Sequence, residues 1–431
     1  MSNNLLQQQS QIFSLSLVRK VRKKIILFLR SEVRDVRENG ISALLQKRGR
    51  MLLLMALAVP VVLVVRALRP LVVIRFGCLI SHRIGHFAGN TELYLCERDA
   101  GMHSQRTHDI FYHTFPICNN QLKKMWDQML HVSRFARYLD MINRYLPGGR
   151  DHVILTSNND RDVHGLLECI PIHLSFTSEE ECMGRAMLRE LGISDGVPFV
   201  CFHSRDSAYL DKMFPNKNLR YHNYRDSNIK NFIPAAEELV RRGYFAVRTG
   251  AVVKESLKTT NPMIIDYATK GRSEFLDVFL GAKNHFYLGD PCGFHAIPMI
   301  FRRPLVIVNM IPLEYAPTWG SDYLFIPKKL WLMEELRFLS FSEILESGIG
   351  RFFLNEQYEQ IGVEVVENTP EEITAVVVEM DERLKGTWQT TEEDEELQQR
   401  FWSPFKPSEL NGIFLSRIGA EFLRQNRELV G

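Results

Sequence analysis

Residues 199–205 read FVCFHSR and residues 244–250 read YFAVRTG, so each is a short apolar run that ends in cationic or hydrogen-bonding side chains. Runs of this kind, separated by helical stretches, are typical of buried strands in a doubly wound α/β sheet. Ligands of such sheets lie outside the carboxyl ends of the strands. The pattern therefore predicts that Arg205 and Arg248 lie at one edge of a sheet, where they indicate an anionic ligand.

The 431 residues are 45% hydrophobic and 24% charged, which is a globular composition in a chain too long for one average core. Strand-like and helical stretches begin to alternate near residue 70, and the alternation continues after a Gly/Asp/Pro-rich break, GISDGVP, at residues 192–198. We expect an α/β protein with two Rossmann-like domains that face a cleft. The expected parts are an N-terminal basic and apolar segment (residues 1–69), a first Rossmann-like domain (70–194), a second one (195–388), and a C-terminal helical segment that crosses back to the first domain (389–431).

The N-terminal segment carries most of the basic character. The whole chain has a formal net charge of +2, but residues 1–50 have +8 and the remainder has −6. Apolar residues follow helical spacing among lysines and arginines in residues 17–36, and residues 51–65 are a continuous apolar run. This run contains Pro60 and is shorter than the roughly 20 residues of a bilayer span. Residues 17–69 are therefore predicted to associate with an anionic membrane surface, with a buried core helix as the alternative. Because the body is acidic, no nucleic acid is expected as a partner.

The seven cysteines form no CxxC pair and no zinc-type spacing. Such scattered thiols are typical of a reduced, cytoplasmic protein. The N-terminus also lacks the pattern of a secretory signal. The triplet Asp160-Arg161-Asp162 has the DxD form that holds a metal ion in some enzymes, but it falls in the first predicted domain, where a helix start is the simpler interpretation. We therefore expect no metal.

The second predicted domain gathers side chains that suit a phosphate ligand. An arginine guanidinium can bind two phosphate oxygens at once, although a surface ion pair is the alternative for any single arginine. The turn LGDPCGFHAIP (288–298) leads into a predicted helix, whose first amide groups could bind phosphate. The residues predicted to bind the anionic donor are His203, Arg205, Arg220, Arg225, Arg248, Gly250, Gly289, Gly293, Phe294 and His295.

Several longer strings resemble a family of bacterial glycosyltransferases encoded with surface-polysaccharide genes. Among them are IGHFAGNTELYLCERDAG (84–101), FHSRDSAYL (202–210) and PAAEELVRRGYFAVRTGAVVKE (234–255). The resemblance covers residues 70–426. It implies a GT-B-like fold and transfer of a sugar from a nucleotide-diphosphate sugar, such as a GDP- or UDP-sugar, to a glycan or lipid-linked acceptor. It also implies no cofactor beyond this co-substrate. The chain departs from the family at His295, where the family has an acidic residue.

Combined with the N-terminal segment, the resemblance implies a protein held at the cytoplasmic face of the inner membrane. On the acceptor side, residues 84–95 supply three candidates directly after the first predicted strand. His86 is the predicted general base, because an imidazole has an ordinary pKa of about 6.5, and Glu92 is the reserve candidate. Asn90 is the third, and helix capping by His86 and Asn90 is the alternative. Two other functions stay open: a nucleotide-sugar epimerase-like enzyme, and a catalytically inactive, membrane-tethered scaffold of a glycan assembly complex.

Overall fold

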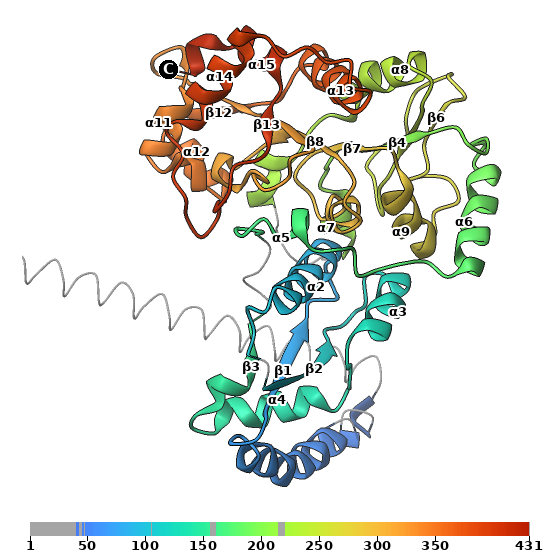
Figure 1. Ribbon diagram of the computed structural model, residues 1–431, viewed down its shortest axis with the longest axis vertical. Coiled ribbons are helices and arrows are strands. Elements are labelled where there is room, and N and C mark those ends of the chain that lie inside the picture. The colour runs from blue at the N-terminus through green and yellow to red at the C-terminus, as the bar shows by residue number, and fades with distance from the viewer. Residues whose placement is uncertain are drawn as a thin grey trace, which may run out of the picture. The chain divides into compact units, whose positions relative to one another are not determined.

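The computed structural model describes residues 40–42, 45–46, 48–104, 106–155, 161–213 and 220–430 (Figure 1). The predicted basic helix within residues 17–36 and Asp160 lie outside the described residues. The chain divides into two compact units. The first contains Met1–Phe76 and Arg134–Val153, and the second contains Gly77–Ser133 and Ile154–Gly431.

The first unit contains a long apolar helix, Arg48–Ala67. By length and composition this 20-residue helix could cross a bilayer, and 17% of its most apolar window is buried. It continues through Pro60, so it is longer than the fifteen-residue apolar run that the sequence showed. Near its end, Arg66 Nε and Nη2 donate to Asn143 Oδ1 at 3.1 and 2.8 Å. Asn143 belongs to α4 (Ala136–Tyr145), which is followed by the short helix η1 (Gly149–His152).

A small sheet has the strand order β2-β1-β3. Its strands are β1 (Val73–Leu79), β2 (Thr107–His113) and β3 (Val153–Ile154). The second unit contains the helices α2 (Ile84–Asp99), α3 (Asn120–Met129), α5 (Leu166–Cys169) and α6 (Ser178–Glu190). Helix α6 begins with a capping box between Thr177 and Glu180.

The second unit also contains a seven-stranded sheet with the order β13-β9-β8-β7-β4-β5-β6. All of its strand pairs are parallel, and nearly all of the strand residues are buried, as expected for a sheet covered on both faces. The predicted α/β class is confirmed. The strands are β4 (Phe199–His203), β5 (Phe245–Arg248), β6 (Ile264–Ile265), β7 (Tyr287–Gly289), β8 (Leu305–Met310), β9 (Tyr323–Pro327) and β13 (Arg417–Ile418).

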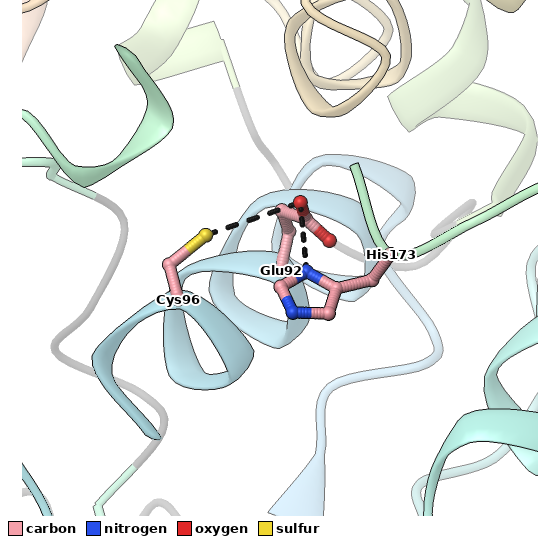
Figure 2. A group of neighbouring side chains, drawn as sticks. All are labelled: Glu92, Cys96 and His173. Atoms are coloured by element: carbon pink, nitrogen blue, oxygen red, sulfur yellow. Dashed lines mark hydrogen bonds and ion pairs between the residues drawn. The ribbon is translucent and has the colours of Figure 1, made fainter. Parts of the chain in front are cut away.

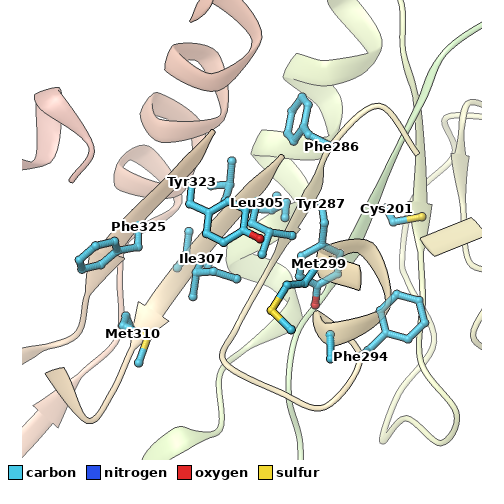
Figure 3. Close-up of a cluster of buried hydrophobic side chains, with 14 of the residues drawn as sticks. Cys201, Phe286, Tyr287, Phe294, Met299, Leu305, Ile307, Met310, Tyr323 and Phe325 are labelled. Carbon is cyan, nitrogen blue, oxygen red and sulfur yellow. The ribbon is translucent and has the colours of Figure 1, made fainter. Parts of the chain in front are cut away.

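Helices cover both faces of this large sheet, with α8 and α13 on one side and α9 on the other (Figure 1). Their bounds are α7 (Ala208–Met213), α8 (Ile233–Arg241), α9 (Glu274–Lys283), α10 (Ala296–Ile300) and α13 (Pro370–Leu384). Side chains of β7, β8, β9 and α10 meet in the apolar core shown in Figure 3. Helix α13 begins with a capping box of Thr369 and Glu372.

The remainder of the second unit differs from the prediction in two respects. Within the second predicted Rossmann-like domain, β12 (Val363–Val366) lies in a separate antiparallel sheet with β10 (Lys329–Leu332) and β11 (Arg337–Phe338). The C-terminal segment is not one helix, although its residues Leu410 and Asn411 contact Arg161 of the first predicted domain. It contains α14 (Glu392–Trp402), β13 and α15 (Ala420–Gln425). Strand β13 pairs with the edge strand β9 through Arg417–Leu324 and Ile418–Phe325, which interrupts the helical segment.

Candidate functional site

The order of the large sheet reverses between β4 and β7. Strands β5 and β6 extend from one side of β4, whereas β7, β8 and β9 extend from the other. Doubly wound sheets bind their ligands at this reversal, outside the carboxyl ends of the strands. His203 ends β4 and pairs with Gly289, which ends β7. We refer to residues 203–206 and 289–295 together as the β4/β7 edge.

Asp290 connects the two strand ends. Its Oδ2 accepts the backbone N–H of Arg205 at 2.7 Å and also the hydroxyl of Ser227. Its Oδ1 accepts the amide of Asn309 on β8 at 2.9 Å. Burial raises the pKa of the Asp290 carboxyl to about 6, although these hydrogen bonds oppose the rise. Sequence analysis missed Asp290 as a site residue, and its position directly after a buried strand was the available signal.

Arg205 and Arg225 both lie at the β4/β7 edge. Arg205 Nη1 contacts the carboxylate of Asp226, and the Arg205 side chain is 12% exposed. Arg225 ends the short helix η3 (Arg220–Arg225) and donates from Nη2 to the carbonyl of Pro291 at 2.6 Å. Burial, with the nearby charge of Arg205, lowers the pKa of Arg225. Its Nε is buried and has no hydrogen-bond partner among the described residues. The two guanidinium groups are close enough for the charge of one to affect the other.

The guanidinium of Arg248 contacts residues that follow β5 and β6. Its side chain is 1% exposed, and Nη1 lies 3.5 Å from Asp266 Oδ1 and donates to the carbonyl of Glu255 at 2.7 Å. The segment after β5 therefore holds this guanidinium by an internal ion pair. Arg220 is exposed at the start of η3, and its carbonyl accepts the amide of Asn355 at 2.8 Å. Arg248 ends β5 in register with Phe202 of β4, so its backbone lies at the same carboxyl edge of the sheet as Arg205, but its guanidinium is held by Asp266 and Glu255.

His203 is surrounded by the predicted glycines. Its Nδ1 lies 2.8 Å from the carbonyl oxygen of Thr249. Gly250 has a φ of 155°, and a Cβ at this position would lie 3.5 Å from His203 Nδ1 and 2.8 Å from Val253 Cγ1. A Cβ on Gly289 would meet the Tyr287 hydroxyl and would lie 2.7 Å from the carbonyl oxygen of His203. Both positions therefore need glycine because other groups approach the backbone closely.

Phe294 and His295 complete the turn after β7. The Phe294 ring is 6.5 Å from the His203 ring, centroid to centroid. His295 Nδ1 accepts the backbone N–H of Cys292 at 3.3 Å. Helix α10 begins only at Ala296 and has five residues, so it is shorter than the predicted phosphate-binding helix. Any anion at this edge would rely on side chains more than on a helix terminus.

The predicted acceptor side lies on α2. A Cβ on Gly85 would be 2.9 Å from the Cα of Gly293, so the first turn of α2 touches the β4/β7 edge directly. His86 follows Gly85, and its Nδ1 lies 3.3 Å from Asn90 Oδ1. Because α2 begins at Ile84, His86 and Asn90 lie inside the helix and do not cap it. The contact between the two glycines places His86 near the edge that carries the arginines.

Glu92 has a different environment. It is fully buried, and its Oε1 lies 2.7 Å from Arg302 Nη2 and 3.1 Å from His173 Nδ1. Figure 2 shows Glu92, Cys96 and His173 facing one another. Burial alone would lower the pKa of His173, but hydrogen bonds with Cys96 and Glu92 and the charge of Glu92 outweigh it and raise this pKa to about 10. A carboxylate held in this way is poorly placed to act as a base for an external hydroxyl.

Glu92, Cys96 and His173 also have the chemistry of metal ligands, with ligand atoms that lie within 4.8 Å of one another. His173 is 77 positions from Cys96 along the chain, so only the tertiary structure brings it to this cluster. Arg302 already supplies a positive charge here, 2.7 Å from Glu92 Oε1 and 3.6 Å from Cys96 Sγ. A metal ion would have to displace this guanidinium, so the cluster is best described as an ion-pair network.

The two described residues of the DxD triplet have structural partners. Asp162 accepts the N–H groups of Leu166 and Leu167, both at 2.8 Å, at the start of α5. Arg161 donates to the carbonyls of Tyr315 and Leu410 at 2.7 and 2.9 Å. These contacts agree with the helix-start interpretation of the triplet. A surface hollow of about 380 Å³ lies elsewhere, and its lining includes Trp331 and Phe338 but no residue of the β4/β7 edge.

No family model matches the chain, and no curated protein matches it either. Three solved structures share part of the fold. E. coli ADP-heptose LPS heptosyltransferase II is 12% identical with a TM-score of 0.36, and the match covers 58% of this chain and 90% of that one. A glycosyl transferase family 9 protein from Veillonella parvula is 10% identical with a TM-score of 0.38, covering 72% and 95%. The iron-containing dodecameric glycosyltransferase TibC from enterotoxigenic E. coli is 10% identical with a TM-score of 0.30, covering 56% and 61%. At these levels of similarity we draw no functional conclusion from them.

Proposed function

We propose that this protein is a GT-B-like glycosyltransferase that binds a nucleotide-diphosphate sugar at the β4/β7 edge and transfers the sugar to a glycan or lipid-linked acceptor. The observation that carries the proposal is the position of Arg205 and Arg225 at the reversal point of a parallel sheet. Guanidinium groups suit the paired oxygens of a diphosphate, and the reversal point is where doubly wound sheets bind nucleotides. The family that the sequence resembles has the same activity.

In the proposed reaction, the bond between the anomeric carbon and the β-phosphate oxygen breaks, and the nucleoside diphosphate leaves with the electron pair. The acceptor hydroxyl forms the new bond to the anomeric carbon and gives its proton to a base. Arg205 and Arg225 would stabilise the charge that develops on the leaving diphosphate, without a metal ion. Because Arg205 already contacts Asp226, the incoming diphosphate would have to compete with that carboxylate.

His86 is the proposed base for the acceptor hydroxyl. The contact between Gly85 and Gly293 brings its helical turn to the β4/β7 edge, whereas Glu92 is buried and paired with Arg302. An imidazole can accept a proton near neutral pH. Exchange of His86 for Gln is expected to reduce turnover by roughly 100-fold or more while donor binding is retained, because general-base catalysis contributes this much.

The test is a thermal-shift screen of the full chain against GDP, UDP and their sugars, because a ligand that binds only the native state raises the melting temperature. The variant Arg225→Ala should lose the shift. The matched control is Arg241→Ala at the end of α8, where the side chain is 74% exposed and the helix leads to the opposite edge of the sheet. An unchanged shift in Arg225→Ala would contradict the site.

The thermal-shift screen and an assay of nucleotide-sugar turnover distinguish the transferase from the other two hypotheses. A scaffold without activity predicts no shift with any nucleotide or nucleotide sugar. An epimerase-like enzyme predicts conversion of the nucleotide sugar without an acceptor, whereas a transferase releases nucleoside diphosphate only when an acceptor is present. No contact among the described residues favours either hypothesis over the transferase.

We also propose that the apolar helix Arg48–Ala67 holds the protein at the cytoplasmic face of the inner membrane. Large apolar side chains on this helix are exposed, among them Leu52 at 62%, Leu53 at 60% and Leu57 at 52%. An exposed apolar surface of this extent needs a nonaqueous partner. The lysines and arginines of residues 17–36 would add attraction to anionic lipid.

A further inference from the structure

The apolar helix Arg48–Ala67 has two faces with different surroundings. Three of its residues, spaced four and three positions apart, lie on one side of the helix and are buried: Ala58, Val62 and Val65. Other sides of the helix carry exposed apolar side chains, among them Leu53 at 60%, Leu57 at 52% and Val64 at 57%. Both faces are therefore apolar, but only one of them is covered by the described part of the chain.

Helix α4 runs beside the apolar helix in the first unit (Figure 1). Its buried residues include Ala136, Leu139 and Asn143, which are spaced three and four positions apart and so form one stripe. Arg66 Nη2 donates to the backbone carbonyl of Asn143 at 2.9 Å and to its side-chain Oδ1 at 2.8 Å. The interval of 77 positions between Arg66 and Asn143 also separates Val62 from Leu139, as expected when two helices run in the same direction. Helix α4 is thus fixed along the second half of the apolar helix.

The polar side chains of α4 are incompatible with an apolar helix that spans the bilayer. A 20-residue helix is about 30 Å long, which is the thickness of the hydrocarbon core. In a spanning orientation, α4 would lie at membrane depth together with the exposed guanidinium groups of Arg137 and Arg144. Charged side chains that face lipid at this depth are strongly unfavourable. If the apolar helix instead lies parallel to the membrane surface, its exposed face enters lipid while α4 stays in water on the opposite side.

We propose that the helix Arg48–Ala67 lies in the plane of the membrane surface, with its exposed apolar face in one leaflet and both of its ends on the same side of the bilayer. This inference rests on the proposed membrane association and adds the orientation to it. The partner is a bilayer with anionic headgroups, because basic side chains flank both ends of the helix. Arg50 is exposed, and Arg69 is 58% exposed although it pairs with Asp151. A second copy of the chain would bring these like charges together in either direction of packing, so it fits this face less well.

The test places a thiol at each end of the helix, in two variants of the full chain. Gly49→Cys is at an exposed position where a Cβ meets nothing within 4 Å, and Leu71→Cys replaces a side chain that is 76% exposed. Bacterial cells that express each variant are converted to spheroplasts and, separately, to inverted inner-membrane vesicles. Both preparations are treated with a membrane-impermeant maleimide, and mass spectrometry quantifies the labelled peptides. We expect both introduced thiols to label about 10-fold more in the inverted vesicles, because the reagent reaches only one face of a sealed bilayer.

Two native cysteines serve as internal references. Cys169 and Cys182 are exposed in the second unit and should label from the same side as both introduced thiols. Labelling after addition of detergent shows that each introduced thiol is reactive. Introduced thiols that label from opposite sides would overturn the in-plane orientation and leave the membrane association intact. A chain recovered from the soluble fraction, as a monomer or as a dimer with a second copy over the apolar face, would overturn the membrane association and with it this inference.

Discussion

The guanidinium of Arg302 and the buried carboxylate of Glu92 lie 2.7 Å apart, from Nη2 to Oε1, and connect the turn after α10 to helix α2. The Glu92 side chain has no exposure and that of Arg302 has 18%. His173 contacts the same carboxylate oxygen, at 3.1 Å. This network joins elements that also meet at Gly85 and Gly293, so it supports the position of α2 against the β4/β7 edge.

Loss of Arg302 should destabilise the protein strongly. Arg302→Ala leaves a buried carboxylate with His173 and the Cys96 thiol as its remaining partners, and we expect a loss of about 3 kcal/mol in the free energy of unfolding, at the low end for a broken buried pair because His173 remains. Chemical denaturation measures this. The double variant Glu92→Gln/Arg302→Gln should lose less than Arg302→Ala, since it leaves no uncompensated charge. Equal losses of stability in the two variants would show that the uncompensated charge on Glu92 does not destabilise Arg302→Ala.

The charge on His173 should make stability depend on pH. Its pKa in the folded protein is raised from 6.5 to about 10, so the imidazolium contributes stability that is fully present below pH 6.5 and is lost as the pH rises through about 10. The difference in melting temperature between wild type and His173→Gln should therefore be largest at pH 6.5 and below and should shrink by pH 10. A difference that is constant over this range would contradict the assignment.

A side chain at position 289 should disturb the β4/β7 edge. Gly289→Ala would place a Cβ against the Tyr287 hydroxyl and 2.7 Å from the carbonyl oxygen of His203, and the backbone carbonyl cannot move freely within the sheet. We expect a loss of about 1–3 kcal/mol, as for other overpacked sites. Gly49→Ala is the matched control, because a Cβ there meets nothing within 4 Å. Denaturant midpoints should fall for Gly289→Ala and not for Gly49→Ala.

Membrane association can be tested on the exposed face of the apolar helix. Leu53→Glu/Leu57→Glu places two charges on side chains that are 60% and 52% exposed, so folding should be little affected. We expect the wild-type chain to float with anionic vesicles in a density gradient, and the double variant to float much less, because each buried apolar side chain contributes about 2 kcal/mol. Equal flotation of both proteins would mean that this face does not enter the bilayer.

Elements that depend on short-range signals were predicted well. The sequence indicates a strand in the run at residues 199–205, and β4 occupies Phe199–His203 of it. The capping boxes that begin α6 and α13 are local signals of the same kind, since each depends on residues only three positions apart. Strands β9 and β13 were missed. β13 is two residues long and exists because β9 offers an unpaired edge, so no local pattern in its own sequence indicates it.

The partners of the predicted site residues could not be found in the same way. A continuous apolar run and strand-end chemistry were enough to place Arg205 after a buried strand, because a strand covered on both faces needs apolar residues at successive positions. The tertiary structure alone decided that Asp226, 21 positions away, contacts Arg205, and that Arg302, 210 positions away, neutralises Glu92. The physical reason is that the energy of a charge inside a protein depends on the distances to other charges in space, and the fold sets these distances independently of separation along the chain.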